Sequence, residues 1–171
     1  VVVGGGNSAV EEGLHLTHFA DQVTLLVRGD RLTASQIAIE KVNEPGSKVK
    51  VQYNTSVDSF DGQDSKLKLI KTRNLVTGES GEVHPAAAFI FIGQQPNSEF
   101  IKSCVKTDSY GFILTGHDLS HEKTESQNQP LAFETSTPGI FAAGDVRHGS
   151  VKQVASAVGE GAAASISIRE Y

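Results

Sequence analysis

The chain opens with Val1-Val2-Val3-Gly4-Gly5-Gly6-Asn7-Ser8-Ala9, and this stretch decides the fold class. A β-branched run stops at three glycines, and apolar residues then recur at helical spacing from Asn7 to Phe19. Gly4, Gly6 and Ala9 have the Gly-x-Gly-x-x-Ala spacing. Its position between a strand and a helix favours a dinucleotide-binding turn over an ordinary glycine-rich turn.

Each position in this turn has an expected role. Gly4 permits the tight turn, Gly6 lets a pyrophosphate approach the backbone, and Ala9 lets the helix pack closely on the strand. Asn7 and Ser8 form the first turn of the helix, where free N–H groups and the positive end of the dipole favour a phosphate. We therefore expect these residues to bind a dinucleotide.

Strands and helices continue to alternate after this turn. We predict strands at Val23–Val27 and Val49–Tyr53, with a helix from about Thr33 to Val42 between them. Residues 1–53 then read β-α-β-α-β, which predicts an α/β fold with a Rossmann-like doubly wound parallel sheet.

The pattern changes over residues 55–83, where polar and apolar residues alternate as in antiparallel strands with one solvated face. We predict an antiparallel meander with turns at Asp61-Gly62 and at Thr77-Gly78-Glu79. A buried strand is expected at Ala87–Ile92, ending at Gly93, and the loop Gly93–Asn97 is interpreted as a domain boundary.

The end of the second strand distinguishes between the two nicotinamide cofactors. An acidic residue there would bind the ribose hydroxyls of NAD, whereas a cation suits the 2′-phosphate of NADP. Arg28 occupies this place, with Asp30 two residues later, so we predict NADPH. Arg31 is either a second phosphate ligand or a solvated surface charge, and the sequence favours neither.

A second informative stretch runs from Thr135 to Asp145, with the sequence TSTPGIFAAGD. We predict a short strand at Ile140–Ala143 that stops at Gly144-Asp145. A glycine lets the backbone pass close to a ligand, and the aspartate lies at the carboxyl end of a strand, where open α/β sheets hold their ligands.

Three further segments complete the prediction. Phe112–Leu114 starts a strand, and the polar run Thr115–Glu134, which includes His117 and His121, is expected to be exposed. A long helix is predicted from Val151 to Ile168, with Gly159 and Gly161 placed for close packing against a neighbour, since glycine costs about 1 kcal/mol inside a helix.

Composition excludes several classes of function. The net charge of −5 argues against nucleic acid and anionic membranes as partners, and no apolar run approaches the length of a membrane span. The only cysteine, Cys104, is interpreted as a structural or incidental thiol, and a cytoplasmic location is the default. His15 and His18 lack a completing carboxylate or thiol, so no metal site is expected.

Taken together, these motifs resemble the low-molecular-weight thioredoxin reductases and their flavoprotein relatives. Residues 4–12 resemble the opening of the family's NADPH domain, residues 135–145 resemble its second flavin fingerprint, and Lys152-Gln153-Val154 stands where the family places a triplet against the flavin ring. The resemblance implies that Asp145 accepts a hydrogen bond from the ribityl chain of FAD. The residues expected to bind NADPH or FAD are Gly4, Gly6, Asn7, Ser8, Ala9, Arg28, Arg31, Gly93, Gly144, Asp145, Lys152, Gln153 and Val154.

The resemblance also implies a domain plan and a reaction. Residues 1–97 would form most of an NAD(P)H-binding domain, and residues 98–171 the carboxyl-terminal segment of an FAD-binding α/β domain. Because Met is absent and the chain opens inside a strand, we expect a piece of a longer polypeptide whose first FAD segment and Cys-x-x-Cys region lie upstream. The catalytic residues are not identified.

The expected activity is that of an FAD-dependent oxidoreductase, in which hydride passes from NADPH to the flavin and electrons then pass to a disulfide. Thioredoxin or another small redox protein would accept them, and the resemblance implies a homodimer. Two alternatives stay open: a ferredoxin-NADP reductase of the same architecture, and a non-catalytic nucleotide-binding module.

Overall fold

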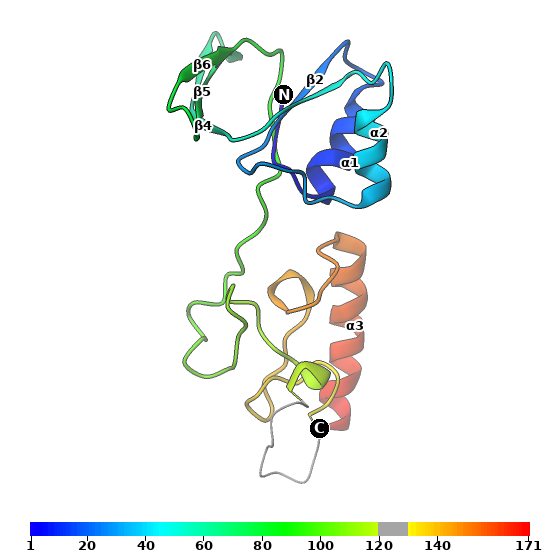
Figure 1. Cartoon of the computed structure of the whole chain (residues 1–171). Helices are drawn as coiled ribbons and strands as arrows, with labels where there is room; N and C mark the ends of the chain where they lie inside the picture. Colours follow the sequence, from blue (N-terminus) through cyan, green and yellow to red (C-terminus); the bar gives the residue numbers. More distant parts are fainter. Residues whose placement is uncertain (120–129) are drawn as a thin grey trace. The chain divides into compact units, whose positions relative to one another are not determined.

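The computed structural model describes residues 1–119 and 130–171, and the chain divides into two compact units, Val1–Gly93 and Gln94–Tyr171 (Figure 1). Each unit has a hydrophobic cluster of its own. The fold class is mixed α/β with one parallel and one antiparallel sheet, as predicted.

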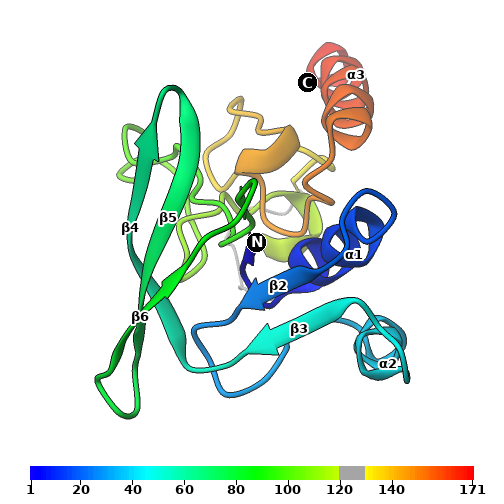
Figure 2. The ribbon, with the colours of Figure 1, turned by 90° about the horizontal axis from the view of Figure 1, so that it is seen from above.

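A four-stranded parallel sheet in the order β3-β2-β1-β7 organises the first unit. Its strands are β1 (Val2–Val3), β2 (Val23–Leu26), β3 (Val49–Gln52) and β7 (Phe89–Ile90). The helices α1 (Asn7–Leu16) and α2 (Gln36–Asn43) lie side by side against this sheet (Figures 1 and 2). Strand, glycine turn and helix therefore follow one another as the sequence predicts.

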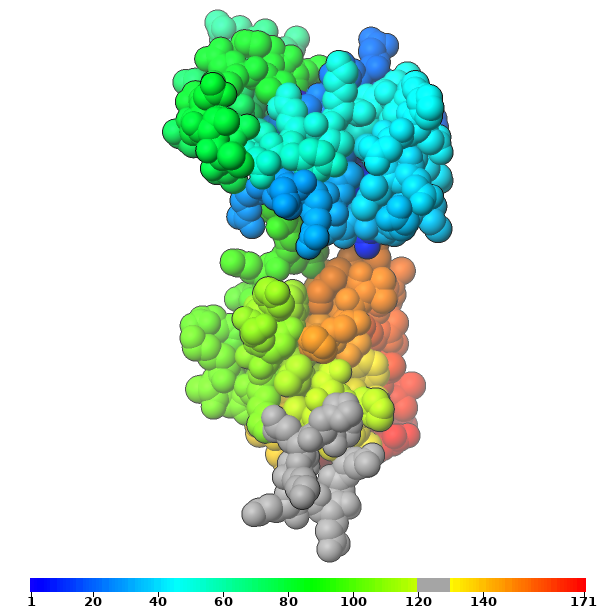
Figure 3. All heavy atoms as spheres, in the orientation of Figure 1, coloured from blue at the N-terminus to red at the C-terminus, as the bar shows by residue number. Residues whose placement is uncertain are grey.

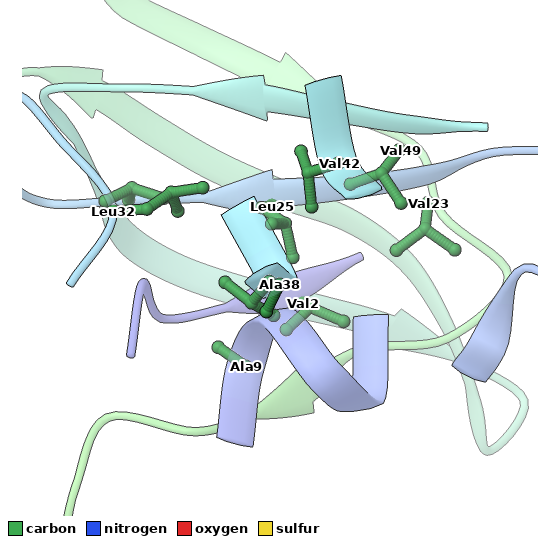
Figure 4. Packing of buried hydrophobic residues seen from close by; sticks show 10 residues of the cluster. Val2, Ala9, Val23, Leu25, Leu32, Ala38, Val42 and Val49 are labelled. Carbon is green, nitrogen blue, oxygen red and sulfur yellow. The ribbon is translucent and has the colours of Figure 1, made fainter. Parts of the chain in front are cut away.

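The core of this unit lies between the sheet and the two helices (Figure 4). Val2, Ala9 and Leu25 are fully buried there. Gly13 explains how α1 comes so close to the sheet, because a Cβ at this position would lie 2.9 Å from Cδ2 of Leu25. A methyl group would push the helix away from β2.

Two predicted element ends in this unit are wrong. The first helix ends at Leu16 rather than Phe19, and the next residues form turns. The second helix begins at Gln36 rather than Thr33, because the hydroxyl of Ser35 accepts a hydrogen bond from the Ala38 N–H and caps the helix at that point.

The predicted antiparallel meander is present as β4 (Thr55–Gln63), β5 (Lys66–Asn74) and β6 (Ser80–Val83). Figure 2 shows the long hairpin of β4 and β5. Its turn lies at Asp64-Ser65, where both residues have positive φ, and not at Asp61-Gly62 as predicted. The register instead shifts between Asp61 and Gly62, so this glycine marks a bulge inside the strand.

The last strand of the parallel sheet was predicted to be buried, and this prediction is wrong. Strand β7 contains only two residues, and Phe89 and Ile90 are 41% and 50% exposed. The strand pairs with β1 alone, which leaves it at the edge of the sheet. The apolar run therefore indicates a strand here but does not indicate that its side chains are buried.

The second unit contains two 3₁₀ turns, η1 (Gly116–Leu119) and η2 (Gly144–Val146), and the long helix α3 (Val154–Glu170). Val105, Ile113 and Ala142 form its buried cluster. The strands predicted at Phe112–Leu114 and Ile140–Ala143 are extended segments joined to the rest of this unit by isolated bridges, such as the one between residues 113 and 147.

Helix α3 starts at Val154 and not at Val151, because Lys152 has a φ of 63°, which an α-helix cannot contain. In Figure 3 the helix is coloured orange to red and lies at the surface of the second unit. The predicted close packing at Gly159 and Gly161 is also wrong for the described residues, since nothing lies within 4 Å of a Cβ built at either position.

The polar segment Thr115–Glu134 was expected to be exposed, but its described ends are not. Thr115 and Glu134 are 2% and 7% exposed, and Leu119 is buried as well. The carboxylate of Glu134 accepts hydrogen bonds from the N–H groups of Leu131 and Gly139, which explains how a charged residue is tolerated there. His121 lies outside the described residues.

Candidate functional site

The glycine turn after β1 is built so that only glycine fits its first position. Gly4 has a φ of 140°, and a Cβ there would lie 2.2 Å from the carbonyl oxygen of Phe91 and 3.1 Å from Cβ of Ala9. Its N–H donates to the carbonyl of Leu26, so the turn crosses the carboxyl ends of three neighbouring parallel strands. This is the edge at which α/β sheets bind ligands.

The other positions of the turn are more open. A Cβ on Gly6 would meet only the hydroxyl of Thr33, at 3.9 Å. Gly6 is also the N-cap of α1, and no side chain caps that helix end. The first N–H groups of α1 are therefore available to an anion, which is the arrangement that favours a pyrophosphate. Ser8 is exposed, and Ala9 is fully buried under the turn.

Asn7 takes part in a brace that sequence reasoning missed. Its Oδ1 accepts a hydrogen bond of 2.7 Å from the N–H of Ser35, while the N–H and hydroxyl of Thr33 both donate to the carbonyl of Gly5. These contacts join residues 28 positions apart and tie the glycine turn to the loop that follows β2. No local spacing rule could have found them.

The loop after β2 carries the two arginines predicted to select NADPH. Arg28 and Arg31 are exposed, and neither guanidinium forms a hydrogen bond or ion pair with the residues that the structure describes. The loop itself is held in place, because the carbonyl of Gly29 accepts from the N–H of Asn54 at 2.8 Å. Both cations are free to meet a phosphate beside the braced turn.

Gly93 is the last residue of the first unit. It lies two residues beyond Phe91, the residue whose carbonyl approaches Gly4. Gly93 has a φ of 94°, and no described atom lies within 4 Å of a Cβ built there. Glycine adopts this positive φ without strain, and packing among the described residues does not require it.

The second unit presents Gly144 and Asp145 in a tight turn. Gly144 is buried with a φ of 79°, and a Cβ on it would lie 3.4 Å from Cβ of Ala157 on α3. Asp145 is exposed, and its carboxylate accepts no hydrogen bond from the described residues. Beside it lies an open hollow of about 440 Å³, lined by Gln94, Gln95, Pro96, Asn97, Phe112, Asp145 and Val146.

The turn is held on one side by Glu160, a residue that sequence reasoning did not identify. Oε2 of Glu160 accepts from the N–H of Gly144 at 2.8 Å and from Nε of Arg147 at 3.1 Å, and Oε1 accepts from Nη2 of Arg147 at 3.0 Å. The hydrogen bond from Arg147 lowers the pKa of Glu160 below its ordinary value and outweighs the opposing effect of burial. A sequence signal did exist, because Glu160 is the only charge between residues 153 and 168.

Lys152 holds the other side of the turn. Its Nζ donates to the carbonyls of Asp145 and Arg147, both at 2.8 Å, and lies 4.0 Å from the ring centroid of Phe112. Gln153 and Val154 follow at the start of α3, and both side chains are exposed. The structure thus brings Gly144, Asp145 and Lys152 into one cluster in the second unit.

The remaining candidates form no second site. The rings of His15 and His18 contact the ring of Phe19 in edge-on and tilted arrangements. Residues 1–119 and 130–171 contain no group of three or more potential metal ligands. Cys104 is exposed and lies beside the hydroxyl of Ser103. No helix in the described part of the chain has the length and apolarity needed to cross a membrane.

Comparison with known proteins gives consistent relatives along the whole chain. The chain is 36% identical to the thioredoxin reductase of Listeria innocua, and the match covers all of this chain and 49% of the relative. It is 38% identical to NADPH-dependent thioredoxin reductase 3 of Arabidopsis thaliana, covering 99% of this chain and 30% of the relative. The chain therefore spans half or less of the length of these relatives.

Solved structures agree. The thioredoxin reductase of Lactococcus lactis matches 99% of this chain and 51% of its own, with 34% identity and a TM-score of 0.73. The thioredoxin reductase of T. acidophilum gives a TM-score of 0.72 at 27% identity. The family model described as pyridine nucleotide-disulphide oxidoreductase matches residues 1–161. The chain belongs to the pyridine nucleotide-disulphide oxidoreductase family.

Proposed function

We propose that the protein containing this chain is an NADPH-dependent flavin oxidoreductase that reduces a protein disulfide. The observation that carries the proposal is the combination of a braced glycine turn, beside two free arginines, with a family match that spans residues 1–161. Family members named thioredoxin reductase, including an NADPH-dependent one, support both the cofactor and the class of acceptor.

NADPH is assigned to the first unit, with residues 1–97 as most of its binding domain. The N–H groups at the start of α1 would receive the pyrophosphate, with Gly4, Gly6, Asn7, Ser8 and Ala9 forming the turn around it. Arg28 and Arg31 would bind the 2′-phosphate, a role that fits their exposure and lack of partners among the described residues. Gly93 is assigned to the edge of this site.

FAD is assigned to the second unit, with residues 98–171 as the carboxyl-terminal segment of its domain. The open carboxylate of Asp145 and the adjacent hollow fit a polyol chain, whose hydroxyl groups donate hydrogen bonds. Gly144 lets the backbone approach the cofactor, and the segment Lys152-Gln153-Val154 is assigned to the flavin ring. Gln153 and Val154 are exposed and available for this contact.

In the proposed reaction, NADPH, one proton and a disulfide are converted to NADP⁺ and a dithiol. Bound FAD supplies the two-electron relay between the nicotinamide and the disulfide. The residues of this chain bind and orient the two cofactors. Thioredoxin is the proposed acceptor, and a homodimer in the cytoplasm is the proposed state of the protein.

Acceptor specificity tests this proposal against the ferredoxin-NADP reductase alternative. We expect the full-length protein to oxidise NADPH when oxidised thioredoxin is added, with stoichiometric appearance of thiols. NADPH oxidation that requires ferredoxin and ignores thioredoxin would instead assign the alternative. The names of the relatives favour the first outcome.

A further inference from the structure

Two side chains donate to or accept from the backbone of the turn that carries Asp145, one from α3 and one from the segment that precedes α3. Glu160 reaches from α3 to the N–H of Gly144, the residue directly before Asp145. Lys152 reaches the carbonyl of Asp145 itself. Glu160 therefore binds a backbone N–H of the turn, and Lys152 binds a backbone carbonyl of the same turn.

The contact made by Glu160 involves a second side chain, that of Arg147. Its side chain and that of Arg147 are only 12% and 19% exposed, and they form a bidentate pair. Arg147 also donates to the carbonyl of His148 at 3.0 Å and lies 5.6 Å from the ring centroid of Phe133. With its guanidinium fixed on several sides, Arg147 fixes the carboxylate of Glu160 in turn.

This geometry has a direct consequence for Asp145. The carboxylate of Asp145 is exposed and accepts no hydrogen bond from the described residues, so its position depends chiefly on the backbone that carries it. That backbone is anchored at Gly144 by Glu160, and Gly144 has a positive φ that is strained for any other residue. A displaced Gly144 would move the carboxylate away from its ligand.

We infer that Glu160 is a positioning residue for the flavin site, acting through the Gly144 N–H to place the Asp145 carboxylate against a polyol of the cofactor. The inference rests on the proposed flavin function. In this role Glu160 touches no cofactor, and Arg147 holds its carboxylate in place. Glu160 is the one charged residue in the otherwise uncharged run from residue 153 to 168.

The test measures the dissociation constant for FAD in the full-length protein by flavin fluorescence, with no turnover required. We expect Glu160→Ala to weaken FAD binding by about tenfold or more, since charge-assisted hydrogen bonds hold the turn. Glu160→Gln keeps an acceptor for the Gly144 N–H and should lose less. Glu170→Ala, an exposed glutamate on the same helix, is the matched control and should bind FAD like the wild type.

A double-mutant cycle separates positioning from general destabilisation. Because Glu160 acts through Asp145, the penalty of Glu160→Gln should largely disappear when Asp145→Asn is already present. Fully additive penalties, or unchanged FAD binding by Glu160→Ala, would overturn the inference. A wild-type protein that binds no FAD would instead refute the proposed function, so the two failures are distinguishable.

Discussion

Gly4 and Gly6 lie two residues apart in the same turn, and the structure predicts opposite consequences for replacing each with alanine. At Gly4 a Cβ would lie 2.2 Å from the carbonyl oxygen of Phe91, and the φ of 140° disfavours any side chain. Phe91 cannot move aside, because its N–H is bonded to the carbonyl of Val3 at 2.8 Å in the parallel sheet. Gly6 has a φ of −87° and open space around it.

The magnitudes follow from these contacts. A strained φ costs about 1–3 kcal/mol and an overpacked contact costs a further 1–3 kcal/mol, so Gly4→Ala should lower the free energy of unfolding by roughly 4 kcal/mol. Gly6→Ala should lower it by only about 1 kcal/mol, because alanine is a poorer N-cap residue than glycine but meets no close contact there. Its added methyl group should instead obstruct the pyrophosphate and weaken NADPH binding.

Urea unfolding monitored by far-ultraviolet circular dichroism gives the two stabilities, and titration of NADPH at low urea gives the two affinities. The expected pattern is a large stability loss for Gly4→Ala and a selective affinity loss for Gly6→Ala. Equal stability losses would contradict the geometric argument at Gly4. Undiminished NADPH affinity in Gly6→Ala would contradict the proposed path of the pyrophosphate.

Three further predictions concern other parts of the chain. Arg28→Ala should weaken NADPH by about tenfold or more and leave NADH nearly unchanged, as measured by titration of each; equal losses would refute its role at the 2′-phosphate. Gly159→Ala should raise the free energy of unfolding by about 1 kcal/mol, because the position is helical with nothing packed on it; a loss of stability would reveal a close neighbour. Because Arg147 lowers the pKa of Glu160 in the folded state, the contribution of this carboxylate is present above its ordinary value of 4.5 and is lost as the pH falls through the lower folded value. Unfolding measured against pH should therefore show a shallower decline below pH 4.5 in Glu160→Gln than in the wild type, and identical declines would exclude this coupling.

Local sequence was sufficient wherever one short segment determines its own conformation. The glycine turn is such a case, because Gly4, Ala9 and the strand before them meet within a few residues. The meander was likewise visible from alternation alone. Its turn was misplaced because Gly62 looks like a turn residue, whereas Asp64 and Ser65 adopt the positive φ values.

Contacts between distant segments account for what the sequence did not reveal. The Asn7–Ser35 hydrogen bond and the Gly144–Glu160 hydrogen bond each join residues that no spacing rule connects. Burial was also beyond reach, since an apolar run such as that containing Phe89 does not show whether the strand lies at a sheet edge. These contacts hold the two candidate sites in shape, and no local spacing rule indicates the residues that make them.

The central claim is that this chain takes part in electron transfer from NADPH to a flavin. The most direct test is the visible absorption spectrum of the purified full-length protein, recorded anaerobically before and after addition of NADPH. We expect a bound flavin whose absorption bleaches on addition of NADPH. A bound flavin that stays oxidised, or a colourless protein that binds NADPH, would contradict it and would support a non-catalytic nucleotide-binding module.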